Sequence, residues 1–427
     1  MAAVPAIFFV HLAHAQINSP YSRFAMGDVY NSRNVVSKGM GGLAAAITDL
    51  QAVNFINSAS YSSLQTVTFD VGIENEIRTL LNPDRTVRSQ SANLLFNYVS
   101  LGFPLAKDKK GFTKWGMAFG LRPYTRVNYK ILDDKRIPGI DSASTIYEGD
   151  GGAYRAFLGT GYRVGGLSLG INAGFLFGAT NINTQRRFNN DTVFYFNSMQ
   201  ETRTSYSRFA LDAGFQYKLK MTKTSFVRIG ATGFLGNSVN AKQDRVRQTF
   251  IYNASNSIDS VDVAERTTQE KGIIELPAGY SAGLSFEKEN KWMIGAEYEA
   301  VNWSTFSYYG LTQTLANTSM LRFGGYWLPN ALEGKNYFSR VTYRVGFYTG
   351  KDLVVVNGTQ LPVWGATFGF SLPVRRYNMY SNQFTSINTS FEFGRRGNAN
   401  VPITENFIRL NFGLNLSDLW FIKRKFD

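Results

Sequence analysis

The chain of 427 residues contains no cysteine, and its only two histidines, His11 and His14, lie close to the N-terminus. Without cysteine there can be no disulfide, and we do not expect a lipoprotein anchor. Outside the first residues there is also no Cys or His zinc site and no Ser-His-Asp or Cys-His nucleophile system. We therefore expect neither an enzyme nor a cofactor.

Long apolar runs are also missing. Beyond the N-terminus no stretch approaches the roughly 20 apolar residues of a membrane helix, and the mean hydropathy is −0.18. This composition excludes a helical membrane protein.

The first residues, Met1 to Ala15, form a short apolar run that ends in Ala13-His14-Ala15. A small-x-small ending of this kind is typical of a secretory signal. We predict that residues 1–15 are removed and that Gln16 begins the mature chain; the alternative is a buried N-terminal strand.

The charge is strongly positive, with 45 Lys and Arg against 31 Asp and Glu. Binding to nucleic acid is one explanation of such an excess. The basic residues are scattered through the chain rather than gathered in a patch, however. They fit better with a barrel lumen of mixed charge or with loops that face lipopolysaccharide, so no nucleic-acid partner is expected.

What the chain does have is aromatic residues (15%), 40 glycines and long alternating segments. Trp115, Met117, Phe119 and Leu121 share one face of their segment, opposite Lys114, Gly116 and Gly120. Such segments are about twice the usual strand length of five or six residues. A lipid-facing Arg or Lys would cost about 2–4 kcal/mol at midplane, and the charged residues keep to the polar face. The pattern predicts a transmembrane β-barrel.

Fourteen such segments predict a fourteen-stranded antiparallel barrel spanning 64–416, followed by a basic tail at 417–427. The segments are 64–80, 88–105, 112–131, 145–164, 166–187, 203–220, 224–241, 272–287, 291–308, 318–328, 336–349, 359–372, 384–395 and 404–416. Connections such as 165–166 are tight, whereas 132–144, 188–202 and 242–271 are long. Short turns belong in the periplasm and long loops outside, so both termini should be periplasmic.

The segment from Ser37 to Leu64 does not alternate and is rich in glycine and alanine. Small residues allow close backbone approach. We predict that residues 16–63 form a plug, or hatch, inside the barrel.

The glycine-rich GMGGLAAAITD followed by Asn57-Ser58-Ala59 resembles the hatch of the FadL/TodX family of outer-membrane hydrophobe transporters. Ser58 stands where that family has proline. The stretches from Ser19 to Phe24 and from Phe407 to Lys425 resemble the subgroup from bacteria with type IX secretion. The resemblance implies passive uptake of hydrophobic small molecules in the outer membrane of a Gram-negative bacterium.

Two groups of residues resemble catalytic motifs, but we do not predict a catalytic site at either. Gly279-Tyr280-Ser281-Ala282-Gly283 matches the G-x-S-x-G elbow, but that motif needs a strand-to-helix turn and a histidine base. Carboxylates such as Glu297, Glu299 and Glu392 fall on inward faces together with arginines, where ion pairs against a plug are the expected arrangement.

Two expected external loops contain apolar clusters: Val193, Phe194, Tyr195, Phe196 and Met199 in one, and Phe250 and Tyr252 in the next. Exposed apolar clusters mark binding sites or interfaces. By resemblance these residues would form a hydrophobic ligand-binding groove. The alternative is that the loops pack on each other.

The alternation of apolar and polar residues continues through Pro123, although proline cannot donate a hydrogen bond to a strand ladder. We therefore predict a kink in the third barrel strand, around Gly120, Arg122 and Pro123. Relatives in the resembled family have a lateral opening in their third strand, so the resemblance implies a gate here. The alternative is an ordinary bulge near the rim.

The function expected from the sequence is passive transport of long-chain fatty acids or similar lipophiles, with exit through the barrel wall. The alternative is an accessory barrel of an outer-membrane assembly or type IX secretion machine, whose partners would be other outer-membrane proteins. Membrane lipid and lipopolysaccharide would surround the protein in either case.

Overall fold

A computed structural model of the chain describes residues 19–138, 141–189, 193–255, 257–330, 336–374 and 384–418. The predicted signal segment 1–15 and most of the predicted basic tail lie outside the described residues. Among the described residues no helix is long and apolar enough to cross a membrane.

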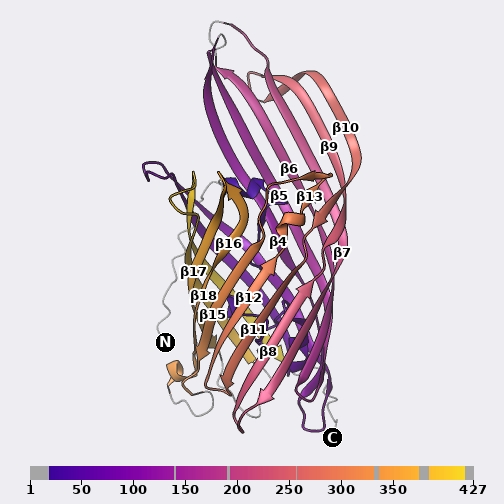
Figure 1. Cartoon of the computed structure of the whole chain (residues 1–427), viewed down its shortest axis with the longest axis vertical. Coiled ribbons are helices and arrows are strands. Elements are labelled where there is room, and N and C mark those ends of the chain that lie inside the picture. The colour runs from indigo at the N-terminus through magenta and orange to yellow at the C-terminus, as the bar shows by residue number, and fades with distance from the viewer. Residues whose placement is uncertain are drawn as a thin grey trace.

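The structure is a closed antiparallel barrel of 14 strands (Figure 1). This confirms the predicted fold class. Twelve of the barrel strands are continuous, and two are interrupted so that each consists of two pieces, β8 with β9 and β10 with β11. Pairing of β19 with β2 closes the ring. The strands are β2 (Val67–Leu81), β3 (Arg88–Lys107), β4 (Thr113–Ile137), β5 (Asp141–Val164), β6 (Leu167–Asn189), β7 (Asn197–Lys220), β8 (Ser225–Phe234), β9 (Asn237–Tyr252), β10 (Ile258–Leu276), β11 (Gly279–Lys288), β12 (Trp292–Val301), β15 (Thr318–Trp327), β16 (Thr342–Val356), β17 (Thr359–Pro373), β18 (Phe384–Arg396) and β19 (Thr404–Asp418).

The two faces of the wall differ as the alternation predicts. Leu284, Ile294 and Phe323 point outward and are exposed, whereas Ser285 and Arg322 point inward and are buried. Successive side chains of a strand lie on opposite faces, so each strand contributes one apolar and one polar row. The apolar rows together form the outer surface that contacts lipid.

Several strands are longer than predicted. β4 has 25 residues, whereas crossing a bilayer takes about 9–11, and the upper parts of β4–β7, β9 and β10 rise beyond the rest of the barrel (Figure 1). We call this extension the upper sheet. The predictions of long loops at 132–144 and 242–271 are therefore wrong, because these ranges are mostly strand. Residues 134–136 of β4 and 258–264 of β10 are exposed on both faces, which removes the apolar-polar alternation by which a strand is detected.

Residues 302–317, between β12 and β15, also differ from the prediction of a strand to 308. They contain η3 (Trp303–Thr305), β13 (Ser307–Tyr308) and β14 (Leu311–Thr312), and β13 pairs with β10. A short helical turn, η4 (Tyr337–Arg340), precedes β16.

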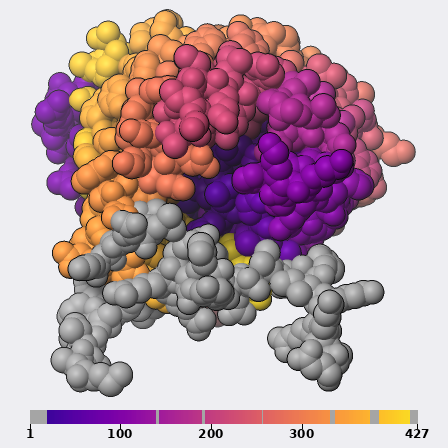
Figure 2. All heavy atoms as spheres, turned by 90° about the horizontal axis from the view of Figure 1, so that it is seen from below, coloured from indigo at the N-terminus to yellow at the C-terminus, as the bar shows by residue number. Residues whose placement is uncertain are grey.

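The N-terminal segment, residues 19–66, lies inside the barrel; Figure 2 shows its indigo atoms within the ring of strands. It contains η1 (Pro20–Arg23), β1 (Asp28–Val29), α1 (Val35–Lys38) and η2 (Ser58–Ser63). Almost every residue from 32 to 47 is buried. The segment predicted to be a hatch is thus surrounded by wall residues.

Candidate functional site

Inward-facing glycines of the wall let the N-terminal segment approach the strands closely. A Cβ added at Gly170 would overlap the backbone of Ser58, one at Gly116 would overlap the carbonyl of Tyr61, and one at Gly346 would overlap the backbone at Gly41. Backbone contact of this kind requires residues without a Cβ. The glycines of the strands therefore determine where the segment can lie.

Asn57 fixes the turn that enters η2. Its Oδ1 accepts a hydrogen bond from the backbone N–H of Ala59 at 3.1 Å. Its Nδ2 donates to the carbonyl oxygens of Ala45, Phe215 and Ala231 at 2.6, 3.1 and 3.2 Å. One side chain thus joins two parts of the segment to β7 and β8. Ala59 is fully buried beside it, and the buried Ser58 hydroxyl has no hydrogen-bond partner among the described residues.

Ion pairs hold the first half of the segment. Arg33 lies 3.1 Å from Glu297 and 2.6 Å from Glu299. The other oxygen of Glu297 accepts hydrogen bonds from the backbone N–H groups of Ala44 and Ala45, at 2.6 and 2.7 Å. A buried carboxylate with this many partners is fully compensated.

A second group of buried charges lines the opposite part of the lumen. Lys38 contacts Glu74 at 2.5 Å, and Arg409 contacts Glu392 at 2.7 Å. The remaining members are Asp28, Glu76, Arg78, Asp352, Arg396 and Glu405. The lumen therefore carries the mixed charge that the scattered basic residues predicted. Among the described residues no group of three or more acidic or histidine side chains could hold a metal ion.

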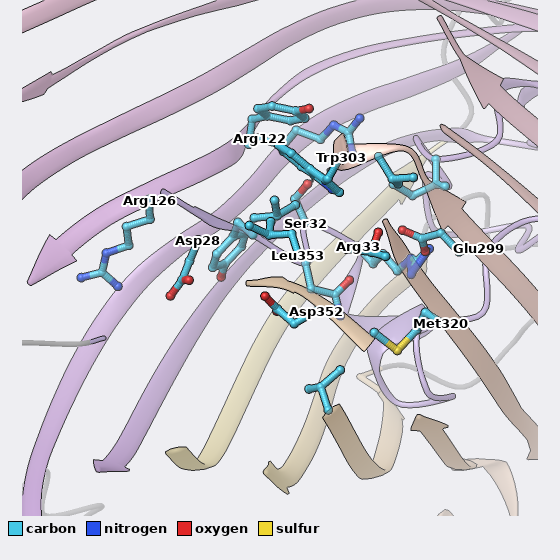
Figure 3. Close-up of a pocket in the computed structure, with 18 of the residues that line it drawn as sticks. Asp28, Ser32, Arg33, Arg122, Arg126, Glu299, Trp303, Met320, Asp352 and Leu353 are labelled. Atoms are coloured by element: carbon cyan, nitrogen blue, oxygen red, sulfur yellow. Dashed lines mark hydrogen bonds and ion pairs between the residues drawn. The ribbon is translucent and has the colours of Figure 1, made fainter. Parts of the chain in front are cut away.

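A cavity of about 350 Å³ remains between the N-terminal segment and the wall. Figure 3 shows Asp28, Ser32, Arg33, Arg122 and Glu299 around it, with side chains from the segment and from the wall facing one another. Apolar residues such as Leu176, Met320 and Leu353 also line it. The cavity can therefore take a molecule that has both polar and apolar parts.

Above this cavity an apolar cluster fills the barrel mouth. Trp303, Phe306 and Leu315 of the 302–317 loop pack with Tyr21 and Met26 of the N-terminal segment. Tyr21 donates a hydrogen bond to the carbonyl of Ile403 at 2.6 Å, and burial, aided by Glu405, raises the pKa of Tyr21 to about 12. Tyr21 therefore remains a neutral donor at physiological pH.

The wall is parted between β3 and β4. Their pairing runs from Lys107 and Thr113 up to Val99 and Leu121, and above that point the two strands share no register. β1 lies against the freed edge of β4, where Val29 is the partner of Thr125. We call the parted region, 88–98 of β3 and 122–137 of β4, the seam.

The residues predicted to form a gate lie at the start of this seam. Gly120 is still paired with Ser100, whereas Arg122 and Pro123 are not paired with β3, and a bulge at Tyr124 follows in the pairing with β5. Arg122 donates to the Ser32 hydroxyl at 3.2 Å and lies over the Phe55 ring. No described contact joins Arg122 to Ala59.

The residues predicted to form an external groove are only partly exposed. Phe194 is 72% exposed and Phe196 49%, with their rings 5.2 Å apart, whereas Met199 and Phe250 are buried. Tyr195 packs on Phe188 and Tyr252 on Phe250; Val193 is exposed. In the part of the chain that the structure describes, none of these residues lines the lumen cavity.

These features define a class of protein: a β-barrel with an apolar outer surface, an occupied lumen and a parted wall. The chain belongs to the BamG family, whose profile matches residues 1–427. No curated protein sequence matches it.

Solved structures share the fold at low sequence identity. The Ralstonia pickettii toluene transporter TbuX has 14% identity and a TM-score of 0.56, covering 90% of this chain and 98% of its own. The Pseudomonas putida toluene transporter TodX has 14% identity and a TM-score of 0.56, covering 93% and 100%. A Pseudomonas aeruginosa FadL homologue has 10% identity and a TM-score of 0.55, covering 92% and 99%.

Proposed function

We propose that this protein transports hydrophobic small molecules passively across the outer membrane, with long-chain fatty acids or similar lipophiles as substrates. The observation that carries the proposal is the seam, where β3 and β4 share no register above Val99 and Leu121. An apolar solute that leaves through a parted wall enters lipid without dissolving in periplasmic water. The mechanism requires no cofactor.

The lumen cavity supplies the inner part of the route. It is lined by Leu95 of β3, by Arg126 of β4 and by Val29 and Tyr30 of the N-terminal segment. The same cavity therefore reaches both sides of the seam. Movement of β1 away from β4 would widen it, so residues 19–66 act as the hatch.

The relatives support this class of substrate, since two of those with the same fold are toluene transporters. We place the protein in the outer membrane, in contact with lipid and lipopolysaccharide, with both termini periplasmic. Phe194 and Phe196, the most exposed aromatic residues of their loop, provide first contact with the solute.

A reversible lock at the seam tests the proposal. Val29 and Thr125 are register partners, and directly opposed residues have Cβ atoms about 4.5–5.5 Å apart, close enough for a disulfide after modest adjustment. In Val29→Cys/Thr125→Cys we expect oxidation to abolish uptake of radiolabelled oleate by cells, and reductant to restore it. The native chain lacks cysteine, so no other thiol interferes.

A disulfide between Thr389→Cys and Phe412→Cys, which are register partners on β18 and β19, is the matched control and should leave uptake unchanged. If the oxidised Val29/Thr125 pair transports oleate as well as the reduced pair, exit at the seam is wrong. If cells with the wild-type protein take up no more oleate than cells without it, transport itself is wrong.

The second candidate function is an accessory subunit of an outer-membrane protein assembly or type IX secretion machine. The upper sheet favours it, because residues 258–264 of β10 are exposed on both faces and stand clear of the membrane-spanning region (Figure 1). Such a surface suits a protein partner rather than a solute.

The upper sheet can be shortened without touching the barrel. Gln243 and Glu270 are register partners, so replacing 244–269 by Asn-Gly closes a two-residue hairpin. For a transporter we expect oleate uptake to persist. For a machine subunit we expect outer-membrane proteins that co-purify with the full chain to be lost, as mass spectrometry of the extracted complex would show.

A further inference from the structure

The seam is not the only discontinuity in the wall. The seventh and eighth barrel strands are both interrupted at the same height, between β8 and β9 at Leu235-Gly236 and between β10 and β11 at Pro277-Ala278. Phe234 pairs with Gly279 below the interruption and Asn237 with Leu276 above it. The register is unchanged across the break, so the opposed pairs Leu235/Ala278 and Gly236/Pro277 lack ladder hydrogen bonds. Pro277 has no N–H to donate.

The ladders to the neighbouring strands are also incomplete at this height, although Asn237 bonds to Arg208 and to the carbonyl of Phe209 through its side chain. On one side, β7 changes register by one residue between its pairing with β9, which ends at Ser207, and its pairing with β8, which begins at Asp212. Residues 208–211 of β7 therefore have no register partner on that edge among the described strands. On the other side β12 ends at Val301, and the next residue, Asn302, donates its backbone N–H to the carbonyl of Ala278.

A groove on the outer surface meets the lumen at this point. Its lining includes the lipid-facing residues Ile171, Leu211 and Tyr280. It shares with the lumen cavity the residues Asp212, Phe234, Leu235, Tyr280, Val301, Thr318 and Lys351. Leu235, which lines both, is 84% exposed. The two hollows therefore border the same residues of the wall.

The break lies at one border of the membrane. β8 and β11 each contribute 10 residues between it and the tight turns. At about 3.3 Å per residue and a tilt of about 40°, this corresponds to about 25 Å, the height of the apolar band of such barrels. A molecule in the groove would therefore lie in the lipid leaflet farthest from the tight turns.

The lumenal end of the groove carries a buried charge pair. Arg155 of β5 lies 2.7 Å from Asp212 of β7, with both side chains less than 10% exposed. The Nε of Arg155 and the Oδ1 of Asp212 are buried without a hydrogen-bond partner among the described residues. Arg122 is the cross-strand partner of Arg155 and donates to a serine rather than to a carboxylate. Two guanidinium groups therefore share one carboxylate, which leaves positive charge to be compensated.

We propose that the break in the seventh and eighth strands is a second lateral portal, which binds a single-chain amphiphile with an anionic head. The head lies at Arg155 and Arg122, and the hydrocarbon chain passes Leu235 and Tyr280 into the leaflet. This proposal rests on the proposed function for its class of substrate, but it assigns a separate opening in the wall, divided from the seam by β5, β6 and β7. Arg122, at the start of the seam, is the one residue that the head site shares with it.

The test uses a fluorophore at the portal. Bimane is attached to Leu235→Cys in the purified, detergent-solubilised protein. A nitroxide-labelled stearate should quench the bimane fluorescence saturably. Ala213→Trp, which changes an exposed residue of the groove, should weaken this binding at least tenfold. Ala282→Trp, which changes an exposed alanine on the same outer surface that lines neither cavity, is the matched control and should not.

A second variant tests the head site. Arg155→Gln/Asp212→Asn removes both charges while keeping the shape of the pair, and we expect about tenfold weaker binding of the stearate but little change for an uncharged nitroxide-labelled alkane. Heat-modifiable mobility checks that each variant is folded. Quenching that rises linearly without saturation, or equally in Ala213→Trp and Ala282→Trp, reflects partition into the micelle only and overturns the portal.

The outcome is separable from that of the proposed function. Saturable quenching of the bimane at position 235 without oleate uptake by cells would retain the portal as a binding site and reject transport. If the disulfide at the seam blocks uptake but quenching of the same bimane does not saturate, transport is retained and only the portal is rejected.

Discussion

At the scale of single residues, Glu297 is the wall residue that joins Arg33 to the backbone of Ala44 and Ala45. A carboxylate can accept this many hydrogen bonds because each oxygen has two lone pairs. The alternation of its strand predicts that Glu297 faces inward, but no feature of the sequence predicts that its partner is Arg33.

Removing Glu297 should loosen the segment. Breaking a buried pair leaves an uncompensated charge and costs about 3–5 kcal/mol, so Glu297→Ala should make residues 31–47 exchange amide hydrogens at least about a hundredfold faster, as mass spectrometry measures. Glu265→Ala is the control, since its partners Arg245 and Arg247 are at least one-third exposed and such pairs contribute about 0–1 kcal/mol. Equal exchange in both variants would contradict the role of Glu297.

The loop aromatics differ in what their replacement should do. Phe194→Ser/Phe196→Ser removes exposed rings, so we expect slower oleate uptake with unchanged barrel stability. Phe250→Ser empties a buried position and should cost about 3–5 kcal/mol. Thermal unfolding followed by gel mobility separates the two effects; normal uptake by the first variant would remove these rings from ligand capture.

At the scale of elements, strand glycines and the N-terminal segment depend on each other. Gly170 of β6 faces Ser58 of η2, and an added Cβ would overlap its backbone, whereas a Cβ at Gly233 of β8 meets no atom closer than 3.6 Å. A strand glycine is therefore required where the N-terminal segment touches the wall, and not at every glycine of the strands.

Gly170→Ala should therefore displace η2, with an overpacking cost of about 1–3 kcal/mol, while Gly233→Ala should not. Limited proteolysis of the folded barrel measures the difference as faster cleavage within residues 48–66. If both variants resist cleavage like the wild type, η2 adjusts to the extra methyl group and the contact does not fix its position.

At the scale of the whole molecule, the tight turns define one end of the barrel and the upper sheet defines the other (Figure 1). The hairpin tip at Asn253–Ser255 joins β9 to β10, and the turn at 108–112 joins β3 to β4. Asn256 of this hairpin lies outside the described residues, so Ser255 is the marker site.

A membrane-impermeant maleimide should label Ser255→Cys on intact cells and Lys109→Cys only after the outer membrane is opened. The physical reason is that short turns face the periplasm in such barrels. Labelling of Lys109→Cys on intact cells, with protection of Ser255→Cys, would reverse the orientation and place both termini outside.

The sequence alone determined the barrel. Rows such as Trp115, Met117 and Phe119 opposite Gly116 and Gly120 follow from contact with lipid on one face and a polar lumen on the other, and a period of two is visible without tertiary information. The same reasoning located a discontinuity at Pro123, because proline lacks the N–H that a ladder needs.

The remaining features depend on contacts between segments that are far apart in the sequence. Residues 134–136 and 258–264 of the upper sheet are exposed on both faces, so no alternation identifies them as strand. Arg33 meets Glu297 across 264 residues of chain, and the break at Leu235-Gly236 becomes an opening only because Pro277-Ala278 of the next barrel strand lies opposite it. Pairing between distant segments is set by ring closure and close packing, which a local pattern does not contain.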